Sequence, residues 1–263
     1  DTLNGAGGAD ELHGEGDEDW LDGSTGDDTL DGGDGADTLT GGEGSDSLAG
    51  GSGNDLLTSS GAWVGTGFDT LAGGEGDDVL MAVGDRAQMT GGAGADRFVI
   101  SATYDDSSST GIDMVGYGFS TVAAASRITD FNEAEGDRIR SGIVDGTSNA
   151  IPVVWRGMAN AGFTATVGQS LALAGADPQD TRFLEFWTFY DAEADQTVLY
   201  MDRNRDFTVD SEDLKLVFDG NVELSASSFT EGTLRARMGS SGADTSATLS
   251  PTSGSDMLLG GRG

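Results

Sequence analysis

The sequence predicts an all-β protein in which an array of short strands precedes a region of antiparallel strands. Two observations lead to this prediction. Residues 1–99 repeat with a period of nine, and each unit combines a glycine-rich stretch with one large apolar residue. Residues 183–224 alternate apolar and polar side chains, as in FLEFWTFYDA and TVLYMDRN. Such alternation is typical of strands that bury one face of a sheet.

Composition excludes several kinds of function. The chain has 263 residues, 46 of them acidic and 13 basic, and a formal net charge of -33. Nucleic acids and anionic membranes would repel this polyanion, so neither is an expected partner, and no apolar run is long enough for membrane insertion. The absence of cysteine excludes disulfides and cysteine-ligated zinc. The single histidine, His13, excludes chemistry that needs two imidazoles.

The repeats align with a single interruption. Six units run from 5 to 58, a five-residue insertion follows at 59–63, and four more units run from 64 to 99. Nine of the ten units have aspartate at position six, the exception being Ala87, and all ten have leucine, methionine or phenylalanine at position eight. A flexible linker rich in glycine and aspartate is the alternative interpretation, and the fixed period argues against it.

Each unit carries the residues for one short strand and one tight turn. Three residues around the apolar position are enough for a strand with one inward side chain. The six residues before it must turn the chain sharply, which glycine permits because it tolerates positive φ. A tight turn points several carbonyl oxygens to one side, and the aspartate adds carboxylate oxygen. An all-oxygen shell of this kind suits a hard cation such as Ca²⁺.

The pattern G-G-x-G-x-D-x-U-x resembles the RTX, or hemolysin-type, calcium-binding nonapeptide repeat. The resemblance implies a right-handed parallel β-roll in which two units form one coil and calcium lies between loops one coil apart. Aspartates 18 residues apart should then pair along two edges, provided that the insertion leaves the alternation of edges unchanged. The expected pairs are Asp10–Asp28, Asp28–Asp46 and Asp46–Asp69 on one edge, and Asp1–Asp19, Asp19–Asp37, Asp37–Asp55, Asp55–Asp78 and Asp78–Asp96 on the other.

These eight pairs predict about eight calcium ions in the first roll. Ala87 should end the first edge early. Glu15 and Asp17 stand where the family has glycine, so the turn in their unit is in doubt, and single loops could have lost calcium. The expected glycine ligands are Gly8, Gly26, Gly33, Gly35, Gly42, Gly44, Gly51, Gly53, Gly65, Gly67, Gly74, Gly76, Gly92 and Gly94. His13 and Trp20 are expected on the surface, with a ligand role for His13 as the alternative.

The segment after residue 99 is expected to cover the open end of the roll. Residues 127–140, RITDFNEAEGDRIR, resemble an element of the serralysin-type C-terminal domain, and the likeness extends to about residue 238. Ile128, Phe131 and Ile139 should pack on the last coil, because its apolar strands need a cover. Asp130 and Asp137 are left for turns or metal.

A second calcium signature lies at 202–213, DRNRDFTVDSED. Its oxygen-bearing residues have the spacing of an EF-hand loop. Phe207 stands in place of the usual glycine and aspartate replaces the final glutamate, so an acidic turn is the alternative. The candidate ligands are Asp202, Asn204, Asp206, Thr208, Asp210 and Asp213.

The sequence predicts three regions: a roll at 1–99, a β-rich cap at 100–238 and the start of a further repeat array at 239–263. Asp244 and Asp256 return to position six in the last region. The chain begins and ends inside a repeat, which leads us to expect an excerpt of a longer protein.

No catalytic constellation is found in the sequence. H-E-x-x-H cannot occur with one histidine, and G-x-S-x-G is absent. We therefore expect a non-catalytic calcium-binding module, and the resemblance implies type I secretion and folding outside the cell. A structural role in a surface layer, filament or adhesin is favoured, with further copies of the chain or a cell-surface component as partners. The alternative is the secretion and folding domain of an extracellular hydrolase, a protease or lipase, whose catalytic domain lies elsewhere.

Overall fold

In the computed structural model, the described residues are 1–59, 67–83, 86–103, 125–144, 153–158, 170, 184–202, 208–209 and 214–229. They form strands, with one short 3-10 helix. Among them, no helix is long and apolar enough to cross a membrane. The strands of the first region are β1 (Thr2–Asn4), β2 (Glu11–His13), β3 (Trp20–Thr25), β4 (Thr29–Asp34), β5 (Thr38–Glu43), β6 (Ser47–Ser52), β7 (Leu56–Thr58), β8 (Phe68–Glu75), β9 (Val79–Ala82), β10 (Arg86–Ala93) and β11 (Arg97–Thr103).

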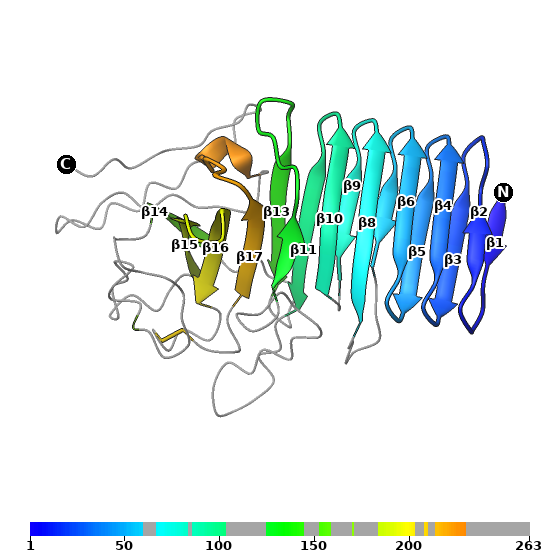
Figure 1. Cartoon of the computed structure of the whole chain (residues 1–263), viewed down its shortest axis with the longest axis horizontal. Helices are drawn as coiled ribbons and strands as arrows, with labels where there is room; N and C mark the ends of the chain where they lie inside the picture. The colour runs from blue at the N-terminus through cyan, green and yellow to red at the C-terminus, as the bar shows by residue number, and fades with distance from the viewer. Residues whose placement is uncertain are drawn as a thin grey trace.

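Odd and even strands separate into two sheets, which makes this region a parallel β-roll. Sheet A has the order β1-β3-β5-β7-β9-β11-β13, and the roll part of sheet B has the order β10-β8-β6-β4-β2. Two successive units therefore form one coil, and the coils stack along the long axis of the molecule (Figure 1). The predicted all-β repeat fold is confirmed.

The insertion at 59–63 does not change the alternation. Leu48 pairs with Leu71 in sheet B, and Leu57 pairs with Leu80 in sheet A, so each strand keeps its neighbour one coil away. The predicted pairing across the insertion is therefore correct.

The apolar residue of each unit points inward, as predicted. Two stacked rows of these side chains form the core between the sheets. The buried leucines of both rows are Leu21, Leu30, Leu39, Leu48, Leu57, Leu71 and Leu80, each at most 1% exposed. Met89 and Phe98 complete the rows toward the cap. One leucine per strand is a thin core, because each buried leucine contributes only about 1.5–3 kcal/mol.

Eight of the eleven strands of the roll are longer than the three residues expected from the sequence, and only β1, β2 and β7 have that length. β4, for example, continues from Thr29 through Gly32 and Gly33 to Asp34. Gly33 pairs with Gly51 one coil on, so the glycine pair takes part in the sheet before the turn begins. Absence of side chains lets these backbones approach closely, which sequence periodicity alone does not reveal.

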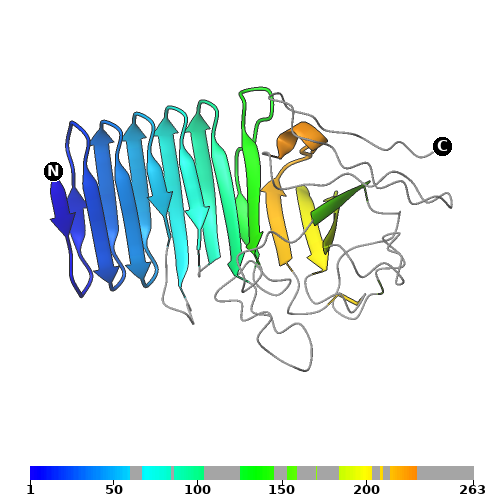
Figure 2. The ribbon, with the colours of Figure 1, turned by 180° about the vertical axis from the view of Figure 1, so that it is seen from behind.

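The cap region continues both sheets. Its elements are β12 (Ser126–Ile128), β13 (Arg138–Val144), β14 (Val153–Met158), β15 (Leu184–Asp191), β16 (Gln196–Asp202), β17 (Leu214–Asp219) and the 3-10 helix η2 (Ala226–Ser228). β13 pairs with β11, and β12 pairs with β10, so these two strands add one more coil to the roll. β15, β16 and β17 are antiparallel, as predicted, and β17 joins them to β12 (Figure 2).

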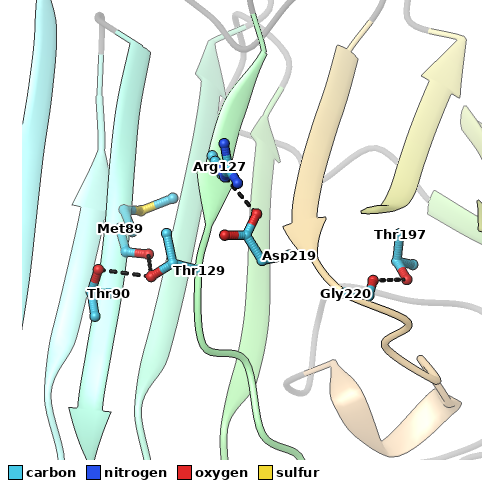
Figure 3. Close-up of polar contacts among 7 residues, drawn as sticks. All are labelled: Met89, Thr90, Arg127, Thr129, Thr197, Asp219 and Gly220. Carbon is cyan, nitrogen blue, oxygen red and sulfur yellow. Dashed lines mark hydrogen bonds and ion pairs between the residues drawn. The ribbon is translucent and has the colours of Figure 1, made fainter. Parts of the chain in front are cut away.

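Apolar packing and polar contacts attach the cap to the last coil. Ile128, Phe131 and Ile139 lie in the same core as the leucine rows, which confirms their expected place. Arg127 Nε donates to Asp219 Oδ1 at 2.5 Å, across β12 and β17 (Figure 3). The hydroxyl oxygens of Thr90, in β10, and Thr129, directly after β12, lie 2.8 Å apart.

A carboxylate anchors the 3-10 helix to the loop before β13. Glu133 accepts hydrogen bonds from the hydroxyls of Ser225, Ser227 and Ser228, the first at 2.9 Å. Although burial opposes ionisation, these hydroxyls and Arg138 leave the pKa of Glu133 below its usual range. The cap therefore contains an ionised carboxylate whose partners are already supplied by the chain.

Candidate metal centre

The repeat aspartates form a ladder along each edge of the roll. One oxygen of each carboxylate, Oδ1, accepts the backbone N–H of the aspartate one coil earlier. The N of Asp10 donates to Asp28 at 2.8 Å, and the N of Asp19 donates to Asp37 at 2.8 Å. The same bond joins Asp28 to Asp46, Asp46 to Asp69, Asp37 to Asp55, Asp55 to Asp78, Asp78 to Asp96 and, through its amino nitrogen, Asp1 to Asp19. All eight predicted pairs are thus brought together.

The other oxygen of these carboxylates is turned toward the inside of the loop. Among the described residues, Oδ2 is buried and accepts no hydrogen bond in Asp10, Asp19, Asp28, Asp37, Asp55, Asp78 and Asp96. A buried carboxylate oxygen without a partner costs free energy, and its recurrence in seven of the ten units argues against an accident of packing. A cation is the partner that this arrangement lacks within the chain itself.

A space lies beside each of these oxygens. A Cβ added to Gly23 would lie 2.5 Å from Oδ2 of Asp28 and 2.6 Å from the carbonyl oxygen of Gly41. On the other edge, a Cβ on Gly14 would lie 2.5 Å from both Oδ2 of Asp19 and the carbonyl oxygen of Gly32. Glycine at position one therefore keeps open a space bordered by a carboxylate and by a carbonyl from the next coil. Carboxylate and carbonyl oxygens are the ligands that Ca²⁺ prefers, so the type of donor fits.

Backbone carbonyls at positions two and four also face the next coil. A Cβ on Gly44 would collide with the carbonyl oxygen of Gly26, and one on Gly51 with that of Gly33. Of the predicted glycines, those whose carbonyl oxygens lie against the next coil are Gly8, Gly26, Gly33, Gly35, Gly51, Gly53, Gly74 and Gly76. Gly65 lies outside the described residues.

The unit with Glu15 and Asp17 keeps its turn, although the sequence placed it in doubt. Glu15 has φ of 72° and Asp17 has φ of 76°, so both adopt the left-handed conformation that glycine usually provides. Their carbonyl oxygens face Gly33 and Gly35 of the next coil. These two carbonyls, and that of Ser24, are candidate ligands that the consensus missed, because a carbonyl is identified by its place in the turn and not by its side chain.

The two edges end differently. On the first, Ala87 follows Asp69 in register, and its N–H donates to Ser126 Oγ at 3.1 Å, so the carboxylate row stops as predicted. On the second, Asp137 continues the row, because its Oδ1 accepts the N–H of Asp96 at 3.0 Å. Asp130 accepts the N–H groups of Gly91 and Gly92. The second edge is therefore longer than the nonapeptides alone indicate.

No three side chains of histidine, cysteine, aspartate or glutamate cluster as a metal site in the described part of the chain. The loops instead offer two carboxylates per interval, with carbonyl oxygens making up the remainder of a shell. Calcium accepts carbonyl ligands readily, whereas zinc and other transition metals select nitrogen or sulfur. The donor set thus favours a hard divalent cation.

His13 and Trp20 are exposed, as predicted. His13 Nε2 lies 3.1 Å from Glu11 Oε1, a contact that raises the pKa of the imidazole. Of the EF-hand-like ligands, Asp202 ends β16 and Thr208 forms a bridge with Ser170. Asn204, Asp206, Asp210 and Asp213 lie outside the described residues, as do residues 239–263.

Burial raises the pKa of aspartates along the second edge. For Asp78 and Asp96, desolvation brings the pKa to about 6, although the N–H bond to each carboxylate opposes the rise. Asp37, Asp55 and Asp137 are shifted in the same direction by the same cause. The metal-free edge thus holds carboxylates that resist ionisation, and a cation beside them would favour the charged form.

Calcium binding is expected to weaken as the pH falls through about 6. Between pH 3.8, the ordinary aspartate pKa, and about pH 6, the metal-free fold binds more protons than the unfolded chain. The contribution of these protons to the stability of the metal-free fold is therefore present at low pH and is lost as the pH rises through about 6. Calcium must displace those protons. At about pH 5 we expect the affinity of each site containing Asp78 or Asp96 to fall by about tenfold relative to pH 7.5.

Calcium titrations followed by circular dichroism at the two pH values would measure this shift. An Asp78→Asn, Asp96→Asn double variant serves as the control, because its remaining sites should show a smaller dependence on pH. Equal midpoints for the native chain at both pH values would contradict the prediction.

The fold and site define a class of protein: a parallel β-roll whose stacked turns present carboxylate and carbonyl oxygens to hard cations. Comparison with known families makes the class specific. Residues 1–30, 22–57 and 63–86 match the model of the RTX calcium-binding nonapeptide repeat, in four copies. The array is therefore an RTX repeat region, and repeats of this family bind calcium.

Two solved structures are similar to the chain. The R2 subunit of the AlgE6 mannuronan C5-epimerase of Azotobacter vinelandii shares 20% identity over 74% of this chain and 92% of its own, with a TM-score of 0.40. The R3 subunit of the same enzyme shares 16% identity over 97% of this chain and 93% of its own, with a TM-score of 0.34. No curated protein matches the sequence.

Proposed function

We propose that this chain is a non-catalytic module of an extracellular protein that folds when calcium binds. The observation that supports it is the row of buried Oδ2 atoms in seven of the ten units, each beside a space that a glycine keeps open. The aspartates and glycines of the loops are the proposed ligands, with about eight ions in the roll, one for each predicted pair. Asp137 continues the row after Asp96, but its Oδ2 already accepts the N–H of Asn132, so we propose no further ion there.

In this proposal the roll folds only with calcium, because the carboxylates of the metal-free roll repel one another. Residues 1–85 contain 21 acidic side chains and no lysine or arginine. Stacking places their carboxylates along two edges, where they repel one another. The single row of leucines in each sheet contributes too little to offset chain entropy and this repulsion together. About eight Ca²⁺ ions would neutralise about sixteen charges and bridge successive coils.

Calcium titration by circular dichroism tests this proposal. Without calcium we expect the spectrum of a coil, and with calcium that of a β protein, with full reversal by EGTA. Magnesium at the same concentration is the control, because it demands a small octahedral shell and keeps its waters. A chain with the same β spectrum in EGTA and in calcium would refute calcium-dependent folding.

The proposed route of secretion rests on the same calcium-dependent folding. A chain that stays unfolded in low intracellular calcium could pass a type I secretion channel and fold outside the cell. The return of the period at 239–263 favours a structural role, in which rolls alternate with caps in a surface layer, filament or adhesin. In this proposal residues 1–99 and 100–238 act as roll and cap, and loop 202–213 is a further calcium site.

A further inference from the structure

The outer face of sheet A carries exposed apolar side chains. This face consists of the side chains at positions seven and nine in the strands of sheet A, and it points away from the leucine core. Trp20 is 42% exposed and Leu56 is 36% exposed, and both occupy position seven. Position seven of sheet B holds only polar residues, namely Glu11, Thr29, Ser47, Thr70 and Gln88, although Phe68 at position five is also exposed.

The same face carries basic residues at its other end. Arg97 and Arg138 are direct neighbours in the pairing of β11 with β13, and Arg140 lies two residues further on the same side. Arg97 and Arg140 are exposed, and in the described part of the chain neither forms an ion pair. Asp22, next to Trp20 on β3, marks the acidic end of the face. Aromatic and acidic groups thus lie on one side of its centre and arginines on the other.

The strand order makes this pattern symmetric about β7. β3 and β11 are each two strands from β7, which is about 10 Å on either side. We propose that two copies of this chain associate through the outer face of sheet A, related by a two-fold axis in the interface parallel to β7. Leu56 then meets the partner's Leu56. Trp20 lies over the partner's Arg97, with Asp22 beside it, and symmetry repeats both contacts.

Charge selects this orientation over the alternative. A two-fold axis across the strands would place arginine on arginine and Asp22 on Asp22, which like charges oppose. In the proposed orientation, arginine faces an aromatic ring and a carboxylate, both of which attract it. Two-fold closure also uses the same face on both copies, so that assembly stops at the dimer.

The area of the face suits a weak dimer. Seven strands span about 30 Å and six residues about 20 Å, which gives at most about 600 Å² per copy and about 1,200 Å² in total. The area around Val99 on β11 is not part of this, because that residue is already buried. This value is at the lower end of stable interfaces, so we expect association that depends on concentration. The face exists only in the calcium-loaded roll, and in this respect the inference rests on the proposed function.

Sedimentation velocity of the whole chain in saturating calcium tests the interface, with circular dichroism of the same samples to show that the roll has folded. We expect a monomer–dimer equilibrium with a dissociation constant between about 10 µM and about 1 mM. Leu56→Lys should raise the dissociation constant by at least about tenfold, because two like charges meet at the axis. Ser47→Lys, at the same position of an exposed strand in sheet B, should leave it unchanged.

Charge exchange separates a direct contact from a folding defect. Asp22→Arg alone and Arg97→Glu alone should each weaken the dimer. An equal mixture of the two variants should restore it, because every contact in the mixed dimer again joins opposite charges. A folded chain that remains monomeric, a Leu56→Lys variant that dimerises normally, a mixture without recovery, or open-ended polymers would each overturn the interface. Failure to fold in calcium would instead overturn the proposed function.

Discussion

Gly44→Ala is expected to prevent the coils from stacking, whereas Gly8→Ala should leave the roll folded. Both glycines occupy position four of units on the same edge, and both have positive φ, 142° and 111° respectively. The conformational cost of an L-residue is therefore shared, at about 1–2 kcal/mol. A Cβ on Gly44 would collide with the carbonyl oxygen of Gly26, whereas one on Gly8 would meet nothing within 4 Å.

The collision cannot be relieved by a rotamer change, because the obstacle is backbone. The two loops would have to separate, and the bond from Gly26 N to the carbonyl oxygen of Glu43, 2.7 Å long, lies beside the contact. We expect Gly44→Ala to cost about 4 kcal/mol or more and Gly8→Ala about 1 kcal/mol. Urea unfolding in saturating calcium, followed by circular dichroism, measures both. Equal losses for the two variants would show that backbone conformation, and not stacking, is what position four requires.

The period of nine predicts the roll because every unit has the same structural requirements. Its apolar residue must be buried, its glycines must turn, and its aspartate must fall 18 residues from the next on that edge. The pairing of Leu48 with Leu71 shows that this logic holds across the insertion. Strand length was less predictable, since Gly32 and Gly33 join the sheet through close backbone approach and not through any propensity of glycine.

The end of the second edge was predictable in part. Asp137 lies 41 residues after Asp96, so the spacing of 18 does not find it. The local pattern does contain a signal, because Asp137 and Ile139 have the relation of positions six and eight. Ile139 is buried in the leucine core, as a position-eight residue should be. The turn at Glu15 and Asp17 could not be predicted from a consensus. The free energy that their positive φ angles cost is offset by the packing of the neighbouring coils, which the consensus does not describe.

Asp37→Asn is expected to remove two calcium ions and raise the calcium midpoint of folding by about tenfold or more. Asp37 belongs to two intervals, since its Oδ1 accepts the N–H of Asp19 and its own N–H donates to Asp55, both at 2.8 Å. Only 1% of the residue is exposed. Asparagine keeps the shape and an acceptor oxygen for Asp19, but it carries no charge, and its amide group would replace Oδ2.

Asp34→Asn is the matched control. Asp34 lies three residues earlier in the same coil, is exposed, and accepts a hydrogen bond from Ser52 Oγ at 2.6 Å. Its replacement removes one negative charge from the roll without touching the buried row, so calcium content and midpoint should stay near the native values. Calcium bound per chain after dialysis, together with the titration midpoint, distinguishes the two variants.

The comparison separates two roles that the ladder of aspartates could have. If the carboxylates serve only to satisfy backbone N–H groups, Asp37→Asn should be nearly harmless, because the amide oxygen accepts the same bond. If Oδ2 holds a cation between coils, loss of its charge weakens the intervals on both sides, and the stack from Asp19 to Asp55 loses its bridges together. A native calcium content in Asp37→Asn would therefore count against cation binding at this edge even if the chain still folded.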